Sequence, residues 1–115
     1  RITIPNSVIE IGDSAFYGCS NLPVINNIRY ADTCLVEVVD KSMDTYQIKT
    51  GTRFISYGAF DGCISLKSIT IPDSVIYIGS CAFEGCTGNM VLVIMSHIII
   101  HLKALNLQML LLATV

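Results

Sequence analysis

Cysteine is the first residue type to consider for chemistry, because thiols form disulfides, act as nucleophiles and bind metals. Three of the five cysteines, Cys19, Cys63 and Cys86, occupy the same position of a repeated motif. If neighbouring repeats stack, Cys63 and Cys86 come within disulfide range, but each can equally act as a small buried hydrophobic residue. The second interpretation is favoured. Cys34 and Cys81 lie elsewhere in the sequence, and the absence of a Cys-x-x-Cys pair excludes a typical zinc site.

Two histidines, His97 and His101, are four residues apart and would share one face of a helix. Ile98 stands where a zinc protease carries its glutamate, and no carboxylate follows. We therefore interpret both histidines as polar interruptions of an apolar segment. The sequence also lacks a nucleophile elbow, a phosphate-binding glycine loop and paired carboxylates. We expect no catalytic residue, no metal and no cofactor, and hence no enzyme.

The elements that carry these residues are repeats. The sequence of residues 2–19, I-T-I-P-N-S-V-I-E-I-G-D-S-A-F-Y-G-C, recurs with most positions identical at residues 69–86. A looser copy, residues 46–63, ends 23 residues before the last one and has Lys49 in place of proline and Ser56 in place of glycine. The intervening segment takes the place of one diverged repeat. A 23-residue period lies within the roughly 20–29 residues of leucine-rich repeats.

Each copy of the motif predicts the same short elements. Alternation at residues 69–71 predicts a strand with one buried face, which Pro72 ends because proline cannot donate a ladder hydrogen bond. Residues 75–78 predict a second extended piece on the opposite wall. Ser80 is expected to cap a single helical turn around residues 82–83. Equivalent side chains of neighbouring repeats would then stack about 4.8 Å apart, in continuous ladders of Ile, Phe and Cys.

The pattern I-T-I-P-x-S-V-x-x-I-G-x-x-A-F-x-G-C over residues 1–88 resembles the BspA-like (Treponema-type) leucine-rich repeat. Residues 28–49 also resemble the strand-turn-strand inserts found between blocks of such repeats. The resemblance implies a leucine-rich-repeat solenoid, a β-rich right-handed superhelix with short helical turns on its convex side. It further implies a bacterial or protist protein, secreted or on the cell surface, that binds host or matrix protein or glycan and has no enzymatic activity.

We divide the chain into four parts: one leucine-rich repeat over 1–27, a strand-turn-strand insert over 28–45, two repeats over 46–88, and an apolar tail over 89–115. Because the chain starts without Met or a signal peptide, we expect it to be a piece of a longer protein whose neighbouring repeats are among its partners. With 52% hydrophobic residues and a net charge of −2, it reads as one folded domain. Nucleic-acid binding is not expected.

The apolar tail keeps only weak register with the preceding repeat. Leu92 and Ile94 align with Ile69 and Ile71, and further on Ile98 and Ile99 align with Val75 and Ile76, but the proline, glycine and Ala-Phe positions are lost. Three interpretations stay open for the tail: a degenerate last repeat that caps the array, a membrane segment, or an out-of-frame sequence. About 20 apolar residues suffice to span a bilayer, although Lys103 would be costly there. Membrane contact is therefore expected only through residues 90–115.

Surfaces remain as candidate functional sites. The outward-facing strand residues and the turns of the insert, where the 26 residues from 28 to 53 carry eight of the sixteen charges, form the candidate partner-binding surface. Its residues are Thr3, Lys67, Ser68, Thr70, Asp32, Asp40, Lys41 and Asp44, with Gln47 and Lys49 from the looser copy. Two hypotheses follow. The chain is either an adhesion module that binds through these residues, or spacer repeats of a longer surface protein that binds elsewhere.

Overall fold

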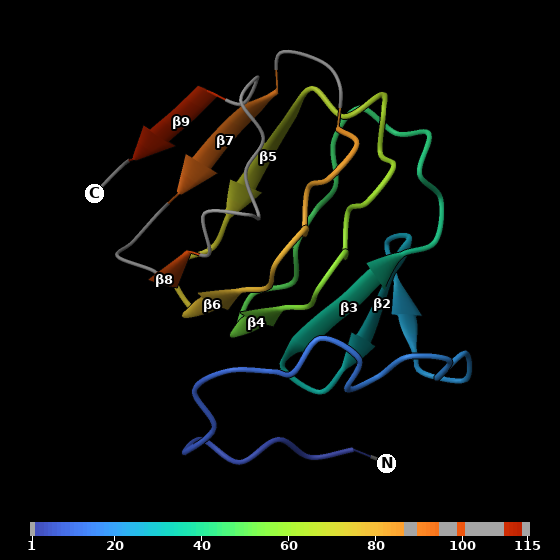
Figure 1. Cartoon of the computed structure of the whole chain (residues 1–115), viewed down its shortest axis with the longest axis vertical. Coiled ribbons are helices and arrows are strands. Elements are labelled where there is room, and N and C mark those ends of the chain that lie inside the picture. The colour runs from blue at the N-terminus through green and yellow to red at the C-terminus, as the bar shows by residue number, and fades with distance from the viewer. Residues whose placement is uncertain (1, 87–89, 95–98, 101–109, 114–115) are drawn as a thin grey trace.

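The computed structural model describes residues 2–86, 90–94, 99–100 and 110–113, and every regular element within those ranges is a β-strand (Figure 1). The strands in chain order are β1 (Val24–Ile25), β2 (Ile28–Ala31), β3 (Cys34–Val38), β4 (Phe54–Ile55), β5 (Ser68–Ile71), β6 (Tyr77–Ile78), β7 (Val91–Ile94), β8 (Ile99–Ile100) and β9 (Leu110–Ala113). The strand expected at residues 69–71 and the second extended piece expected at 75–78 correspond to β5 and β6.

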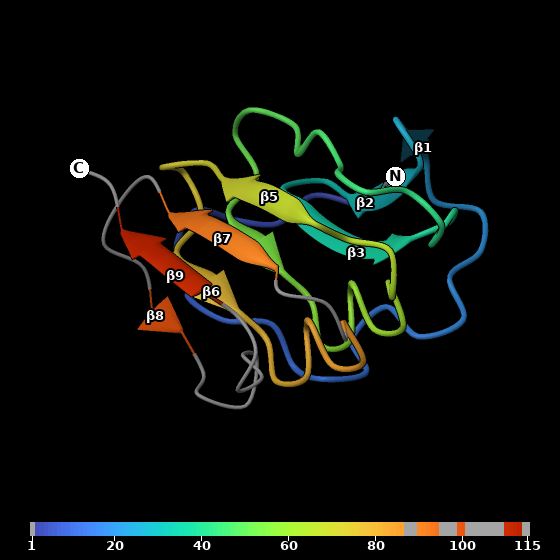
Figure 2. The same cartoon turned by 90° about the horizontal axis from the view of Figure 1, so that it is seen from above.

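The strands form two sheets, one ordered β1-β2-β3-β4-β6-β8 and the other β5-β7-β9, which Figure 2 shows from above. From β3 onward all pairing is parallel. Phe54 pairs with Tyr77 and Ile69 pairs with Leu92, so β4 and β6, and likewise β5 and β7, are one 23-residue period apart. The last complete repeat contributes β5 to one sheet and β6 to the other, whereas the copy over residues 46–63 contributes only β4.

The register of the apolar tail agrees in part with the sequence alignment. Leu92 and Ile94 of β7 lie opposite Ile69 and Ile71 of β5, as expected. Ile99, which the alignment placed opposite Ile76, instead pairs with Tyr77, one residue further along. Ile98, also part of that alignment, lies outside the described residues.

The predicted helical turns are wrong. The loops that carry Ala-Phe-x-Gly-Cys are tight turns closed by hydrogen bonds of the i to i+3 kind, such as Cys86 N to Phe83 O at 3.2 Å. Left-handed backbone conformations at both ends of the last loop prevent a helix there. Cys81, directly after the expected cap Ser80, has a left-handed φ of 58°, and Gly85 has a φ of 79°.

The larger core cluster contains the ladders predicted from the middle repeat (residues 46–63) and the last complete repeat (residues 69–86). The rings of Phe60 and Phe83 stack with centroids 5.0 Å apart and an interplanar angle of 7°. Cys63 and Cys86 are buried free thiols, which confirms the small-hydrophobe interpretation over the disulfide. Backbone hydrogen bonds join the two loops at each rung, for example Phe60 N to Ala82 O at 2.7 Å.

The first repeat (residues 2–19) departs from the expected ladders although its sequence nearly matches that of the last complete repeat. Ala15 and Cys19 are exposed and Phe16 is half-buried. Ile4 and Ile11 pack instead in a second cluster, with residues of the insert and of β4 and β6. The physical reason is the neighbour in sequence, because the insert has no Ala-Phe-x-Gly-Cys loop on which the first repeat could continue the ladder.

The insert itself belongs to the larger sheet. β2 and β3 form an antiparallel hairpin, and β3 pairs in parallel with β4 through Cys34 with Phe54 and Leu35 with Ile55. The amide of Val38 donates to the carbonyl of Ala59 at 3.1 Å, which supplies one rung toward the loop of the middle repeat. The insert thus takes the place of a repeat in one sheet.

Candidate interaction surface

Strand β5 presents the clearest polar row among the predicted surface residues. Ser68 and Thr70 are exposed, while Ile69 and Ile71 between them are buried, as alternation on a half-buried strand requires. The carbonyl of Asp44 accepts hydrogen bonds from the amides of Lys67 at 2.8 Å and Ser68 at 3.4 Å. The turn of the insert over residues 40–44 therefore lies beside the start of β5. We call the exposed residues Asp40, Lys41, Asp44, Lys67, Ser68 and Thr70 the β5 surface.

Hydrogen bonds hold the 40–44 turn in place. The Oδ1 atom of Asp40 accepts from the Ser42 hydroxyl at 2.6 Å and from the Ser42 amide at 2.9 Å. These bonds favour the ionised carboxylate, the hydroxyl contributing most, and keep the pKa of Asp40 below its usual value. The hydroxyl of Tyr46 donates to the Asp40 carbonyl at 2.6 Å. The turn is thus anchored to a buried aromatic residue.

Two predicted surface residues lie away from the β5 surface. Thr3 is exposed but belongs to the first repeat, which contributes no strand to the sheet of β5 (Figure 1). Asp32 sits in the β2–β3 turn with a φ of 54°, and its Oδ2 atom accepts from the Ile4 amide at 2.7 Å. Asp32 therefore ties the first repeat to the insert.

A groove of about 740 Å³ beside Asp32 was not anticipated from the sequence. In it the Lys49 ammonium lies 4.8 Å from the centre of the Tyr30 ring, and the Lys49 amide donates to the Tyr30 hydroxyl at 2.9 Å. Burial, the largest influence, raises the pKa of Tyr30. The sequence feature that could have indicated this groove is Lys49 in place of the motif's proline. Proline has no amide hydrogen, so only a replacement can donate to the Tyr30 hydroxyl.

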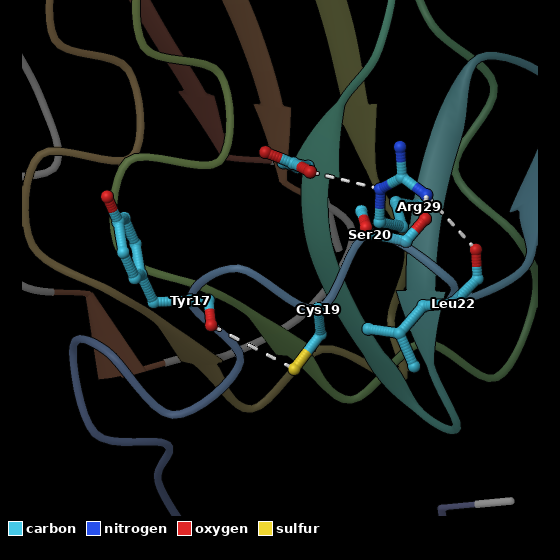
Figure 3. Close-up of polar contacts among 6 residues, drawn as sticks. Tyr17, Cys19, Ser20, Leu22 and Arg29 are labelled. Carbon is cyan, nitrogen blue, oxygen red and sulfur yellow. Dashed lines mark hydrogen bonds and ion pairs between the residues drawn. The ribbon is translucent and has the colours of Figure 1, made fainter.

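A second hollow, of about 510 Å³, lies between the first repeat and the strands of the larger sheet. We call it the Tyr17 hollow; its walls include Asp13, Phe16, Tyr17, Glu37, Tyr57 and Gly58. Figure 3 shows Tyr17 projecting away from Cys19 and Arg29. At the rim Arg29 pairs with Glu37 at 3.0 Å and donates to the Ser20 carbonyl at 2.6 Å. Sequence reasoning missed the hollow because Tyr17 occupies a variable position of the motif, held by Glu84 in the last complete repeat.

The buried thiols are poorly suited to nucleophilic chemistry. Burial raises the pKa of Cys34 and of Cys86 to about 12, so both stay protonated at neutral pH. Cys19 is a free, exposed thiol. In the part of the chain that the structure describes, no group of three His, Cys, Asp or Glu residues is placed to hold a metal ion. His97 and His101 lie outside that part.

Comparison with protein families gives one match. Residues 1–36 and 38–107 match a model described as "BspA type Leucine rich repeat region (6 copies)". Leucine-rich repeats generally mediate protein interactions or serve as scaffolds. Searches of curated proteins and of solved structures returned no match. Within the described ranges, no helix has the length and apolar character needed to cross a bilayer.

Proposed function

Because the chain belongs to the BspA-type leucine-rich-repeat family, we propose that it is a non-catalytic binding module of a secreted or cell-surface protein. In this proposal its repeats form a right-handed solenoid, and the β5 surface recognises a host or matrix protein or glycan. Proteins of this family are commonly associated with the cell surface, which supports the location.

The observation that carries the proposal is the pairing of Asp44 with the start of β5. It joins the polar row of a strand to the charged turn of the insert, two features 24 residues apart in sequence at Asp44 and Ser68. Such a combined face offers hydroxyls, two lysines and two carboxylates on rigid backbone. A surface that is ordered before binding loses less conformational entropy when a partner docks.

The experiment measures binding of the chain to a panel of immobilised matrix proteins and glycans. We expect saturable binding to at least one, lost when residues 40–44 are replaced by Gly-Ser and weakened by Thr70→Glu, which adds a charge at an exposed site without touching the turn. Glu10→Gln, an exposed change in the first repeat, is the matched control. If both surface variants bind as well as the parent, the β5 surface is not the contact.

A structural role is the second candidate. Parallel pairing of β4 with β6 and of β5 with β7, each at a 23-residue offset, lets repeats extend an array without any partner, which favours spacer repeats. This hypothesis expects the chain to bind nothing in the panel while a longer protein that contains it does bind. That result would overturn the binding proposal in favour of the spacer hypothesis.

A further inference from the structure

The Tyr17 hollow lies where a rung of the ladder is missing. In the middle repeat the amides of Gly58, Phe60 and Gly62 donate to the carbonyls of Ser80, Ala82 and Glu84 at 3.2, 2.7 and 2.9 Å. The equivalent amides of the first repeat are those of Ser14, Phe16 and Gly18. None of these three donates a hydrogen bond to any described residue, and all three residues line the hollow.

The unpaired amides form a row of hydrogen-bond donors along the hollow, which a peptide backbone can bind. In the middle repeat the same row of donors is satisfied by every second carbonyl of the neighbouring turn, over residues 80–84. A peptide segment in extended conformation presents carbonyls with the matching periodicity, as in other cases where a peptide adds to an open backbone edge. The hollow's volume of about 510 Å³ is within the range of ligand sites.

Two tyrosines with exposed rings flank this edge. Tyr17 is 91% exposed and Tyr57 is 45% exposed. Aromatic rings that are not packed into a core offer their negative faces to a partner, and guanidinium or ammonium groups bind such faces.

The two charged residues that line the hollow, Asp13 and Glu37, are both acidic. Asp13 makes no hydrogen bond or ion pair with any residue the structure describes, and Glu37 remains 54% exposed beside its partner Arg29. Contact with Cys81 is the main reason that the pKa of Tyr57 is raised, and the negative charges of Glu84 and Asp13 raise it further. A cation entering the hollow would therefore meet a negative potential, whereas a neutral sugar would gain nothing from it.

We propose that the Tyr17 hollow binds an extended peptide segment of a partner protein through its backbone carbonyls and an arginine or lysine side chain. The carbonyls accept from the amides of Phe16 and Gly18, while the cationic group lies against the Tyr17 ring near Asp13. The site deepens the proposed interaction function by naming a partner chemistry. It uses no residue of the β5 surface, so the two proposals can fail independently.

The test is a two-dimensional ¹H–¹⁵N NMR titration of the whole chain with acetyl-Gly-Arg-Gly-amide. Its neutral counterpart carries citrulline, which keeps the shape of arginine without the charge. We expect saturable shifts at the amides of Ser14, Phe16 and Gly18, and binding of the citrulline peptide about five-fold weaker. Equal binding of the two peptides, or no shifts at these amides, would overturn the proposal.

Two exposed substitutions locate the contact. Tyr17→Ala and Asp13→Asn should each weaken binding of the arginine peptide about two- to five-fold. Asp73→Asn, the same charge change at an exposed turn outside the hollow, should leave it unchanged. If Asp13→Asn behaves like Asp73→Asn, the charge assignment is wrong. If methyl glucoside shifts the three amides and the arginine peptide does not, the hollow is a sugar site instead.

Discussion

The first repeat and the last complete repeat share most of their sequence, but most of their equivalent residues differ in burial. Phe83, Ala82 and Cys86 are buried in the main core, whereas Phe16 is half-buried and Ala15 and Cys19 are exposed. The motif alone therefore does not decide whether its loop is buried. That depends on whether the adjacent segment supplies a second loop of the same shape, as the nearest-neighbour nature of repeat proteins requires.

The largest difference in stability is expected between the matched variants Phe83→Ala and Phe16→Ala. Removing the Phe83 ring, which stacks on Phe60, should lower the free energy of unfolding by about 3–5 kcal/mol. The same change at half-buried Phe16 should cost about 1 kcal/mol. Chemical denaturation followed by circular dichroism measures both. Equal losses at the two positions would show that the first repeat packs like the last.

A smaller difference is expected for Gly79→Ala and Gly12→Ala. A Cβ atom on Gly79 would lie 2.6 Å from the Tyr57 nitrogen and 2.9 Å from the Ser56 carbonyl carbon, both backbone atoms of the middle repeat. Gly12, its equivalent, has no atom within 4 Å of such a Cβ. We expect Gly79→Ala to cost about 1–3 kcal/mol and Gly12→Ala less than about 0.5 kcal/mol. A tolerated Gly79→Ala would contradict the close approach of the two repeats.

Replacement of Lys49 tests why the middle repeat lacks the proline of the other two. Lys49→Pro restores the motif but removes the amide that donates to the Tyr30 hydroxyl, so the free energy of unfolding should fall by about 1 kcal/mol. Lys49→Gln keeps the amide, and removes only the ammonium over the ring; it should cost less. Thermal unfolding of the two variants side by side gives the answer. A variant with proline that is as stable as the parent would mean the hydrogen bond contributes nothing.

Thiol reactivity should separate the two repeats without unfolding the chain. With iodoacetamide at pH 8, Cys19 is expected to react and Cys86 to be protected, which peptide mass spectrometry detects.

The raised pKa of Cys86, about 12 against an ordinary 9.0, also gives a pH dependence. The protonated thiol stabilises the fold fully below about pH 9, and this contribution is lost as the pH rises toward 12. Cys86→Ala should flatten that alkaline decline and Cys19→Ala should not. In the iodoacetamide experiment, modification of Cys86 as fast as that of Cys19 would contradict the burial of Cys86.

The features that follow from local pattern were predictable from the sequence. Alternation at Ile69, Thr70 and Ile71 gave β5, and the 23-residue period gave the pairing of Ile69 with Leu92. The turns could not be inferred as non-helical, because nothing in the sequence marks Cys81 for a left-handed φ. The position of the first repeat was also hidden, since it depends on contacts with distant residues. Arg53, for example, donates to the carbonyls of Asn6 at 3.1 Å and Val8 at 3.2 Å.

Separation in sequence also explains why parts of the candidate sites were not predicted. The β5 surface was found in large part because its side chains are polar within strand or turn patterns. The groove of Lys49 and Tyr30 joins residues 19 positions apart, and the Tyr17 hollow joins the first repeat to residues of β3 and of the middle repeat. Such walls are made by tertiary packing, and the local sequence carries little sign of them beyond Lys49 in place of the motif's proline.

The pairing of β3 with β4 requires only two residues of each strand, Cys34 and Leu35 against Phe54 and Ile55. The insert otherwise contacts the repeats through buried side chains and a few backbone hydrogen bonds, so its exposed turn residues are not fixed by the repeat pattern. A gene encoding such an array can therefore gain or exchange foreign loops by recombination, provided that a short matching strand is kept at the junction. Evolution could then vary what the protein displays without having to redesign the core that displays it.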